Sequence, residues 1–329
     1  MNEKQKEIIE QYDLVVENSY RSRGCLHLVT DRGLYMLTPY GGSPVRLAWE
    51  CELQKKLLEQ GFSNLDTVLP NREDGFIVYD KYRSPFIVKK AYEGKECNLR
   101  EEKEVRRACE NLALLHRALR NLDNFQVENR NTPSLLQMQR AKTLELKRIR
   151  NYIKKSGRKM EFELTFTSCY EQFYQEAVEV LCWLEGKPAS FYQRGFGICH
   201  GAYHQHNVLL TEEKVFTLNL GQFHYNQQLM DLYNIVRKAL EKNQYQKRIF
   251  DGAMEAYGKI LPLEKEDYEV LYGFFSFPEK FWKISNQYYN GKKCWMPPKN
   301  LDKLKKTVGQ NEKRLEFLRR WRAEDGIGW

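Results

Sequence analysis

The stretch CHGAYHQHNVLL, residues 199–210, and the stretch VFTLNLG, residues 215–221, are the most informative part of this 329-residue sequence. Each contains a short run of β-branched, aliphatic or aromatic residues, and the charged segment 211–214 between the runs has the composition of a turn. The sequence therefore predicts a β-hairpin with one loop before its first strand and another after its second. The first loop contains His200, Gly201 and Asn207, and the second contains Asn219.

This order of residues resembles the catalytic and metal-binding loops of aminoglycoside-phosphotransferase-like and choline-kinase-like enzymes. In those enzymes the first loop has the pattern H-G-D-x-x-x-x-N, and an I-D pair opens the second. The resemblance places His200 and Gly201 at the H-G pair, and Asn207 at the metal-binding asparagine. It implies a bilobal fold like that of a protein kinase.

Two positions depart from the pattern of these enzymes. Phosphoryl transfer needs one carboxylate to orient the attacking hydroxyl and another to hold Mg²⁺ against the phosphates. Ala202 stands where the first belongs, and Asn219 stands where the second belongs. An alanine accepts no proton, and an amide lacks the negative charge that binds a hard dication strongly. The resemblance therefore predicts a degenerate site, with His200 and Asn207 retained and the phosphotransfer machinery broken.

The first 96 residues mix strand and helix signals and predict the smaller lobe. Strands are expected at residues 25–30, 34–37, 67–70, 75–79 and 86–90, with one helix at about 44–60. Gly61 is well placed to end that helix. The order β-β-α-β-β-β is typical of a small antiparallel sheet with one packed helix.

The resemblance also implies which residues of the small lobe would meet a nucleotide. In these enzymes a strand lysine pairs with the phosphates and with a helix glutamate. Thr38 stands at the lysine position, and Glu50 is the candidate glutamate, with Glu52 as a second candidate. The nucleotide-covering turn at 21–24 has one glycine where the family has three. Glu50, Asn207 and Asn219 are thus expected as remnants of a nucleotide and Mg²⁺ site, and no bound cofactor is expected.

From about residue 97 the apolar residues recur with a helical period. Val105, Cys109 and Leu112 begin an apolar stripe that predicts a core helix. A basic stretch at 121–159 is expected to be partly helical, a further helix is expected at about 170–184, and strand signals return only at 195–220. The sequence therefore predicts an α+β fold with a mixed lobe at 1–96 and a mostly helical lobe at 97–329.

The C-terminal region narrows the resemblance to one family. The segment SFPEKFWKISNQYYN, residues 276–290, is similar to the CotS family of spore coat proteins, which are kinase-like proteins of endospore-forming bacteria. The Glu93-Gly94 pair fits the same family, and the LALLH segment at 112–116 resembles a helix of the wider group of phosphotransferase-like proteins. The resemblance implies a pseudokinase that serves as a structural or assembly component of the spore coat. It would be synthesised in the mother-cell cytoplasm, and its partners would be other coat proteins.

Two further functions remain compatible with these residues. One is an active small-molecule or protein phosphotransferase with a rearranged site, in which His204 or Asp231 supplies the base. The other is an ATP-binding switch without turnover. ATP and Mg²⁺ are expected to bind only if one of these two hypotheses holds. Helix capping is favoured for Asp231. A zinc site at His200, His204, His206 and His224 is disfavoured, since no acidic or cysteine ligand is obviously placed beside them.

Composition excludes several classes of protein. The net charge is +9, but the basic residues are spread through amphipathic segments and no nucleic-acid-binding motif occurs. The eight cysteines form no C-x-x-C pair, and no run of about 18 apolar residues suggests a membrane span. The N-terminus has no apolar leader, so a cytoplasmic protein is expected. The aromatic residues at 272–289 and the basic helix at 300–322 are expected to pack on the large lobe.

Overall fold

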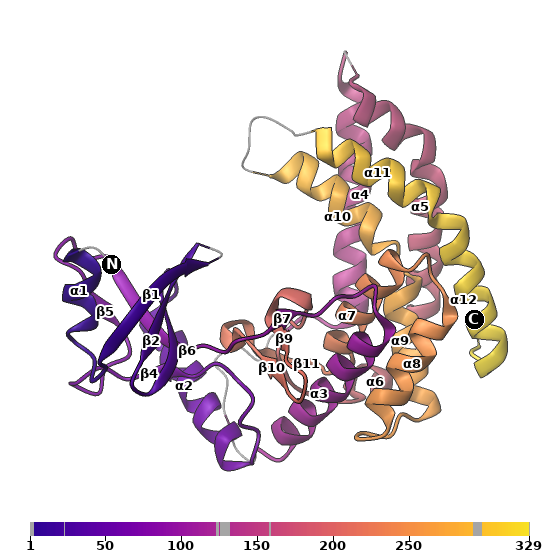
Figure 1. Ribbon diagram of the computed structural model, residues 1–329. Coiled ribbons are helices and arrows are strands. Elements are labelled where there is room, and N and C mark those ends of the chain that lie inside the picture. The colour runs from indigo at the N-terminus through magenta and orange to yellow at the C-terminus, as the bar shows by residue number, and fades with distance from the viewer. Residues whose placement is uncertain are drawn as a thin grey trace.

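The computed structural model describes residues 3–22, 24–122, 125, 132–157, 159–291 and 298–328. The chain forms a small sheet lobe, at the left of Figure 1, and a larger, mostly helical lobe at the right (Figure 1). The small lobe has an antiparallel sheet with a packed helix, which confirms the predicted α+β bilobal fold. The predicted division at residue 96 falls at the end of β7 (Lys95–Glu96).

The small lobe is built on a six-stranded antiparallel sheet. The strand order is β1-β2-β3-β6-β4, and β5 also pairs with β6. Its elements are α1 (Glu3–Ile9), β1 (Val16–Ser22), β2 (Cys25–Thr30), β3 (Gly33–Pro39), α2 (Pro44–Glu59), β4 (Val68–Leu69), β5 (Val78–Tyr79) and β6 (Pro85–Lys90).

The two faces of this sheet carry separate apolar clusters, because successive strand residues point to opposite faces. Leu37 and Val88 pack on one face with Ile8 of α1. Ile87 packs on the other face with Leu47 of α2. Residues that alternate with Leu37 and Val88 therefore face α2, which is the side turned toward the functional residues.

Helix α2 begins and ends as its sequence predicts. The Ser43 hydroxyl accepts a hydrogen bond from the backbone N–H of Arg46 at 3.2 Å, and Pro44 occupies the first turn. Gly61 follows the helix at φ +81°, a conformation that suits glycine. The observed end at Glu59 lies one residue before the expected one.

Strand β1 and helix α1 were not predicted. The sequence VENSYRS of β1 has no buried residue, so it carries no apolar signal, and the strand exists because it pairs with β2. The turn expected at 21–24 does join these two strands, although Arg23 lies outside the described residues.

The large lobe holds most of the helices. They are α3 (Glu102–Arg120), α4 (Leu135–Lys155), α5 (Glu161–Glu185), α6 (Ala189–Gln193), α7 (Leu229–Lys242), α8 (Lys247–Gly258), α9 (Lys265–Ser276), α10 (Glu279–Asn290), α11 (Pro298–Gly309) and α12 (Asn311–Asp325). The helix expected at 170–184 begins earlier, at Glu161. Helices α4, α5, α10 and α11 form a projecting group with its own apolar cluster (Figure 1).

The predicted hairpin is present between the lobes. It consists of β9 (Val208–Leu210) and β10 (Val215–Thr217), which pair antiparallel, and β7 adds a third strand to β9. A second small sheet pairs β8 (Phe196–Cys199) with β11 (His224–Gln227), a strand that was not predicted. Within the described ranges, no helix has the length and apolar character needed to cross a membrane.

Candidate functional site

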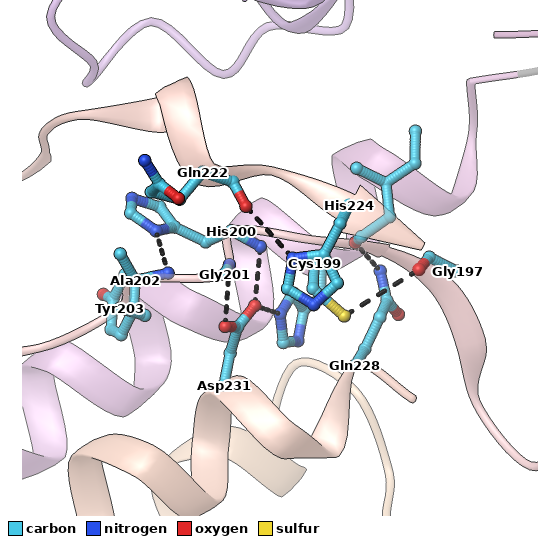
Figure 2. Close-up of polar contacts among 12 residues, drawn as sticks. Gly197, Cys199, His200, Gly201, Ala202, Tyr203, Gln222, His224, Gln228 and Asp231 are labelled. Carbon is cyan, nitrogen blue, oxygen red and sulfur yellow. Dashed lines mark hydrogen bonds and ion pairs between the residues drawn. The ribbon is translucent and has the colours of Figure 1, made fainter. Parts of the chain in front are cut away.

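Residues 200–207, which we call the His-Gly loop, connect β8 to β9 and are held by Asp231 of α7. The Asp231 carboxylate accepts hydrogen bonds from the backbone N–H groups of His200 at 2.6 Å and Gly201 at 3.0 Å (Figure 2). The Nε2 atom of His116 lies 3.3 Å from the same carboxylate. Burial acts to raise the pKa of Asp231, but these donors outweigh it and hold the pKa below its ordinary value. Asp231 is therefore an anchor for the loop.

This finding corrects the role expected for Asp231. The sequence favoured a capping role, whereas α7 begins after Gln228 without any side-chain cap. The carboxylate faces the His-Gly loop, in the view of Figure 2, and its hydrogen bonds go to groups 30 or more positions away along the chain. Spacing along the chain could not have revealed these partners.

Gly201 is required by the close approach of a neighbouring segment. Its φ is +77°, and a Cβ atom there would lie 2.1 Å from the carbonyl oxygen of Gln222. Figure 2 shows the Gln222 carbonyl, which also accepts a hydrogen bond from Nδ1 of His224. The H-G pair thus fixes the loop against the segment that precedes β11.

His200 braces the loop through backbone groups. Its Nε2 donates to the carbonyl of Leu218 at 2.9 Å, and its Nδ1 accepts from the N–H of Ala202 at 3.1 Å. These partners assign a neutral imidazole with its proton on Nε2. Burial is the main reason that the pKa of His200 lies below its ordinary value. Both ring nitrogens of His200 are therefore engaged in hydrogen bonds to the backbone.

Asn207 and Asn219 are bonded to each other. The Asn207 amide donates from Nδ2 to the Ala202 carbonyl at 3.0 Å, which turns its Oδ1 toward Asn219. The Nδ2 atom of Asn219 then donates to that Oδ1 at 2.8 Å. Mg²⁺ prefers oxygen ligands that include carboxylates. This pair offers none, and one of its two amide oxygens already accepts a hydrogen bond, so the residues present do not fit the ion.

The small lobe fixes the backbone of Asn219. That residue has φ +61° and ψ +61°, a left-handed conformation that asparagine tolerates. Its N–H donates to Oδ1 of Asp66 at 2.9 Å. Just beyond it, in η2 (Leu220–Gln222), the Gly221 carbonyl accepts from Nε of Arg46 at 3.1 Å. The backbone of the loop after β10 is therefore hydrogen-bonded to the small lobe at both Asn219 and Gly221.

Aromatic and backbone contacts join the lobes nearby. Tyr92 stacks on Phe216 of β10 with a centroid distance of 3.9 Å, and its hydroxyl donates to the Leu65 carbonyl at 2.9 Å. Leu65 and Thr217 form a parallel bridge. These contacts leave the hairpin and the small lobe packed as a unit at this point.

A buried lysine, Lys89, supplies a cation that the sequence did not predict. Its Nζ lies 2.8 Å from Oε1 of Glu50 and 3.6 Å from Oδ2 of Asp66. All three side chains are at least 93% buried. The two carboxylates, working against burial, hold the pKa of Lys89 above its ordinary value, so it stays charged. We call these three residues the buried triad.

Lys89 lies on the α2 face of the sheet, as Thr38 does. Thr38 pairs with Ile87 and Met36 pairs with Lys89, so all four side chains alternate onto that face. The hydroxyl of Thr38 is buried without a hydrogen-bond partner in the described chain. The lysine–glutamate pair is thus present, with its lysine on β6 and not on β3. Glu50, the first candidate, makes the pair, whereas Glu52 makes an exposed pair with Lys56.

The remaining histidines do not form a metal site within the described residues. No group of three or more His, Cys, Asp or Glu side chains there is arranged to hold a metal ion. His206 bonds Glu96 at 2.7 Å, and His224 bonds the Gln222 carbonyl at 3.0 Å. His204 is half-buried, and its Nδ1 has no hydrogen-bond partner among the residues that the structure describes. Burial, followed by the charge of Lys238, lowers the pKa of His204 to about 4.

The lowered pKa of His204 predicts that the protein loses stability in mild acid. The folded chain holds His204 neutral down to about pH 4, while an unfolded chain protonates histidine near pH 6.5. The unfolded state therefore binds more protons between these values, and stability falls as pH drops from 6.5 toward 4. We expect the melting temperature, followed by circular dichroism, to decrease from pH 7 to pH 5. His204→Gln should reduce that decrease and His206→Gln, at an exposed position, should not; an equal decrease in both variants would contradict the assignment.

The fold is shared with small-molecule kinases. An aminoglycoside phosphotransferase from Alicyclobacillus acidocaldarius has a TM-score of 0.86 at 18% identity, covering 98% of this chain and 96% of that one. Spectinomycin phosphotransferase APH(9)-Ia has a TM-score of 0.64 at 11% identity, covering 95% and 98%. Choline kinase from Cryptosporidium parvum has a TM-score of 0.55 at 10% identity, covering 96% and 92%. At such identities the likeness concerns the fold alone.

The sequence also matches a family profile along nearly its whole length. The profile is described as "Spore coat putative kinase YutH", and it covers residues 5–321. A comparison with curated proteins finds no match.

Proposed function

The chain belongs to the YutH family of kinase-like spore coat proteins, and we propose that it is a pseudokinase that serves the spore coat as a structural or assembly component. The family assignment confirms the spore coat resemblance noted in the sequence. The loss of phosphotransfer, the assembly role, the location in the coat and the coat-protein partners are parts of the proposal. Synthesis in the mother cell belongs to it as well.

The observation that carries the proposal is the hydrogen bond between Asn207 and Asn219 beside Ala202. In a working kinase this place holds a metal ion between a carboxylate and an amide oxygen, with a second carboxylate for the attacking hydroxyl. Here two amides satisfy each other, and the backbone of Asn219 is fixed from the small lobe by Asp66. The arrangement is stable without a metal, and Ala202 supplies no base.

The charges around Lys89 support the same proposal. A phosphate-binding lysine must present its cation to the nucleotide. Lys89 faces two buried carboxylates, so the buried triad carries a net negative charge that would repel a polyphosphate. The retained lysine–glutamate pair is accordingly assigned to holding α2 against the sheet.

Thermal stability with ATP tests the loss of the nucleotide site. A ligand at about 100 times its dissociation constant stabilises a fold by about 2.7 kcal/mol, or about 4 °C for a chain of this length. We expect no Mg²⁺-dependent rise in melting temperature for the natural chain at millimolar ATP. The variant Ala202→Asp/Asn219→Asp should acquire such a rise, because the restored carboxylates would bind Mg²⁺ and the metal charge would offset the repulsion between the buried triad and the phosphates. Gln60→Glu, an amide-to-acid change at the exposed residue that follows α2, serves as the control and should not.

The alternatives make different predictions in the same assay. A Mg²⁺-dependent rise for the natural chain, without ATP hydrolysis, would replace the proposal by an ATP-binding switch. Hydrolysis or phosphate transfer that disappears in Asn207→Ala would establish a phosphotransferase with a rearranged site. The coat part of the proposal is tested separately, by fractionating purified spores and probing the coat layer for the protein.

A further inference from the structure

A pocket in the large lobe lies beside the His-Gly loop and includes no residue of the buried triad or the asparagine pair. Its volume is about 300 Å³, and its walls come from α5, α7, α9, α10, α11 and α12. Gln205 of the His-Gly loop also lines it. We call it the basic pocket, because seven cationic side chains and two carboxylates line it in the described part of the chain.

The carboxylates leave most of this positive charge uncompensated. Glu241 binds both Arg237 and Lys280, and Glu279 binds Lys142, which lies outside the pocket. Four lysines, namely Lys238, Lys242, Lys303 and Lys306, have no carboxylate within ion-pair distance among the described residues. These four side chains come from α7 and α11, on different walls of one cavity.

The protonated form of Lys238 is disfavoured by this concentration of positive charge. It is half-buried, and burial followed by the charges of Arg237 and Lys283 lowers its pKa to about 8. Lys280 opposes its protonation too, Glu241 favours it, and His204 of the His-Gly loop lies close enough to interact with it. A cation kept among other cations costs folding free energy, and such a cost is common where a binding site is maintained.

The inner wall of the basic pocket is apolar. Phe275, Phe277 and Phe281 line the pocket and are nearly fully buried. The sequence favoured simple packing for these aromatic residues, and they do pack the large lobe, but their edges also form the wall of a cavity. The pocket thus combines an apolar wall with unpaired cations.

We propose that the basic pocket binds a small organic polyanion, whose apolar body contacts Phe275 and Phe277 and whose carboxylate or phosphate groups contact Lys238 and the α11 lysines. The cavity volume is at the lower end of the range for small-molecule sites. Unpaired cations favour anions and oppose a cationic ligand such as an aminoglycoside. This proposal does not rest on the loss of phosphotransfer, because no residue of the buried triad or the asparagine pair lines the pocket.

Isothermal titration with a matched set of anions tests the proposal. Phthalate and phenyl phosphate share one aromatic ring and differ in their anionic groups, and inorganic phosphate has no apolar body. We expect phthalate or phenyl phosphate to bind more tightly than inorganic phosphate, and the tighter of the two identifies the anionic group. The variant Lys238→Met keeps the aliphatic stem and removes the charge. It should weaken binding about tenfold, while raising the melting temperature by about 2 °C because a poorly solvated cation is lost.

The control is Lys55→Met, at an exposed lysine on α2 of the small lobe, which should leave binding unchanged. Opposite changes in affinity and stability for Lys238→Met separate a binding role from a structural one, which would lower both. The proposal is overturned if neither aromatic anion binds at about 10 mM, or if Lys55→Met weakens binding as much as Lys238→Met. Equal affinity for inorganic phosphate and phenyl phosphate would overturn the assignment of an organic ligand.

Discussion

Replacing Lys89 by methionine is expected to lower the free energy of unfolding by about 3–5 kcal/mol. The substitution removes the one cation of the buried triad and leaves Glu50 and Asp66 as unpaired carboxylates, 4% and 3% exposed. Burial already raises the pKa of Asp66 to about 6 with Lys89 present, so its charge is costly there. Chemical denaturation followed by circular dichroism measures the change.

The triple variant Glu50→Gln/Asp66→Asn/Lys89→Met should recover most of the lost stability. It removes all three charges and keeps side chains of similar volume, and the amide oxygen introduced at position 66 can still accept from the backbone N–H of Asn219. Lys95→Met is the matched control, because Lys95 pairs with Glu104 at 2.6 Å while 71% exposed, where an ion pair contributes about 0–1 kcal/mol. If Lys89→Met cost no more than Lys95→Met, or if the triple variant gave no recovery, the buried triad would not be an electrostatic unit.

Lys89 also illustrates what the sequence could not reveal. In the segment PFIVKK, residues 85–90, the two lysines follow an apolar run and have the pattern of a strand end entering solvent. Alternation puts Lys89 on the face of Ile87, but only the pairing of β6 with β3 and the position of α2 make that face a buried one. Asp66, in the segment between α2 and β4, has no local signal at all.

Elements with strong local signals were predicted closely. Strand β2 occupies the expected residues 25–30, and α2 occupies all but the last of 44–60, because alternation, the helical spacing of apolar residues and the position of Gly61 are all local signals. The hairpin of β9 and β10 follows from two apolar runs around a charged turn. Strand β1 has no apolar signal and β11 depends on a partner, β8, that is distant along the chain, and both were missed.

For the candidate site, the sequence predicted which residues lie together but not how they are bonded. A fixed spacing around His200 and Gly201 located Ala202, Asn207 and Asn219, and these residues do lie together. The hydrogen bond between the two asparagines was not predictable, because it depends on how the loop after β10 is turned by Asp66. Whether this site has lost nucleotide binding stays a prediction for the ATP assay.

Asp231→Ala should destabilise the chain by about 4–5 kcal/mol. The Asp231 carboxylate is fully buried and is an acceptor for the backbone of His200 and Gly201. His116 reaches it as well, and since an ionised carboxylate only accepts, the His116 proton lies on Nε2 and its Nδ1 accepts from Tyr257. Alanine leaves three buried donors without an acceptor. Thermal and chemical denaturation would both measure the loss.

Asp231→Asn should fall between the natural chain and Asp231→Ala, at about 2 kcal/mol, because an amide has one accepting oxygen where the carboxylate has two. The control is Asp251→Ala, which removes a carboxylate that is 52% exposed and paired with Lys247, at a cost below about 1 kcal/mol. An Asp231→Ala chain as stable as Asp251→Ala would show that another contact shapes the His-Gly loop. The expected ranking would instead show that the hydrogen bonds of Asp231 to His200 and Gly201 hold the His-Gly loop in its folded form.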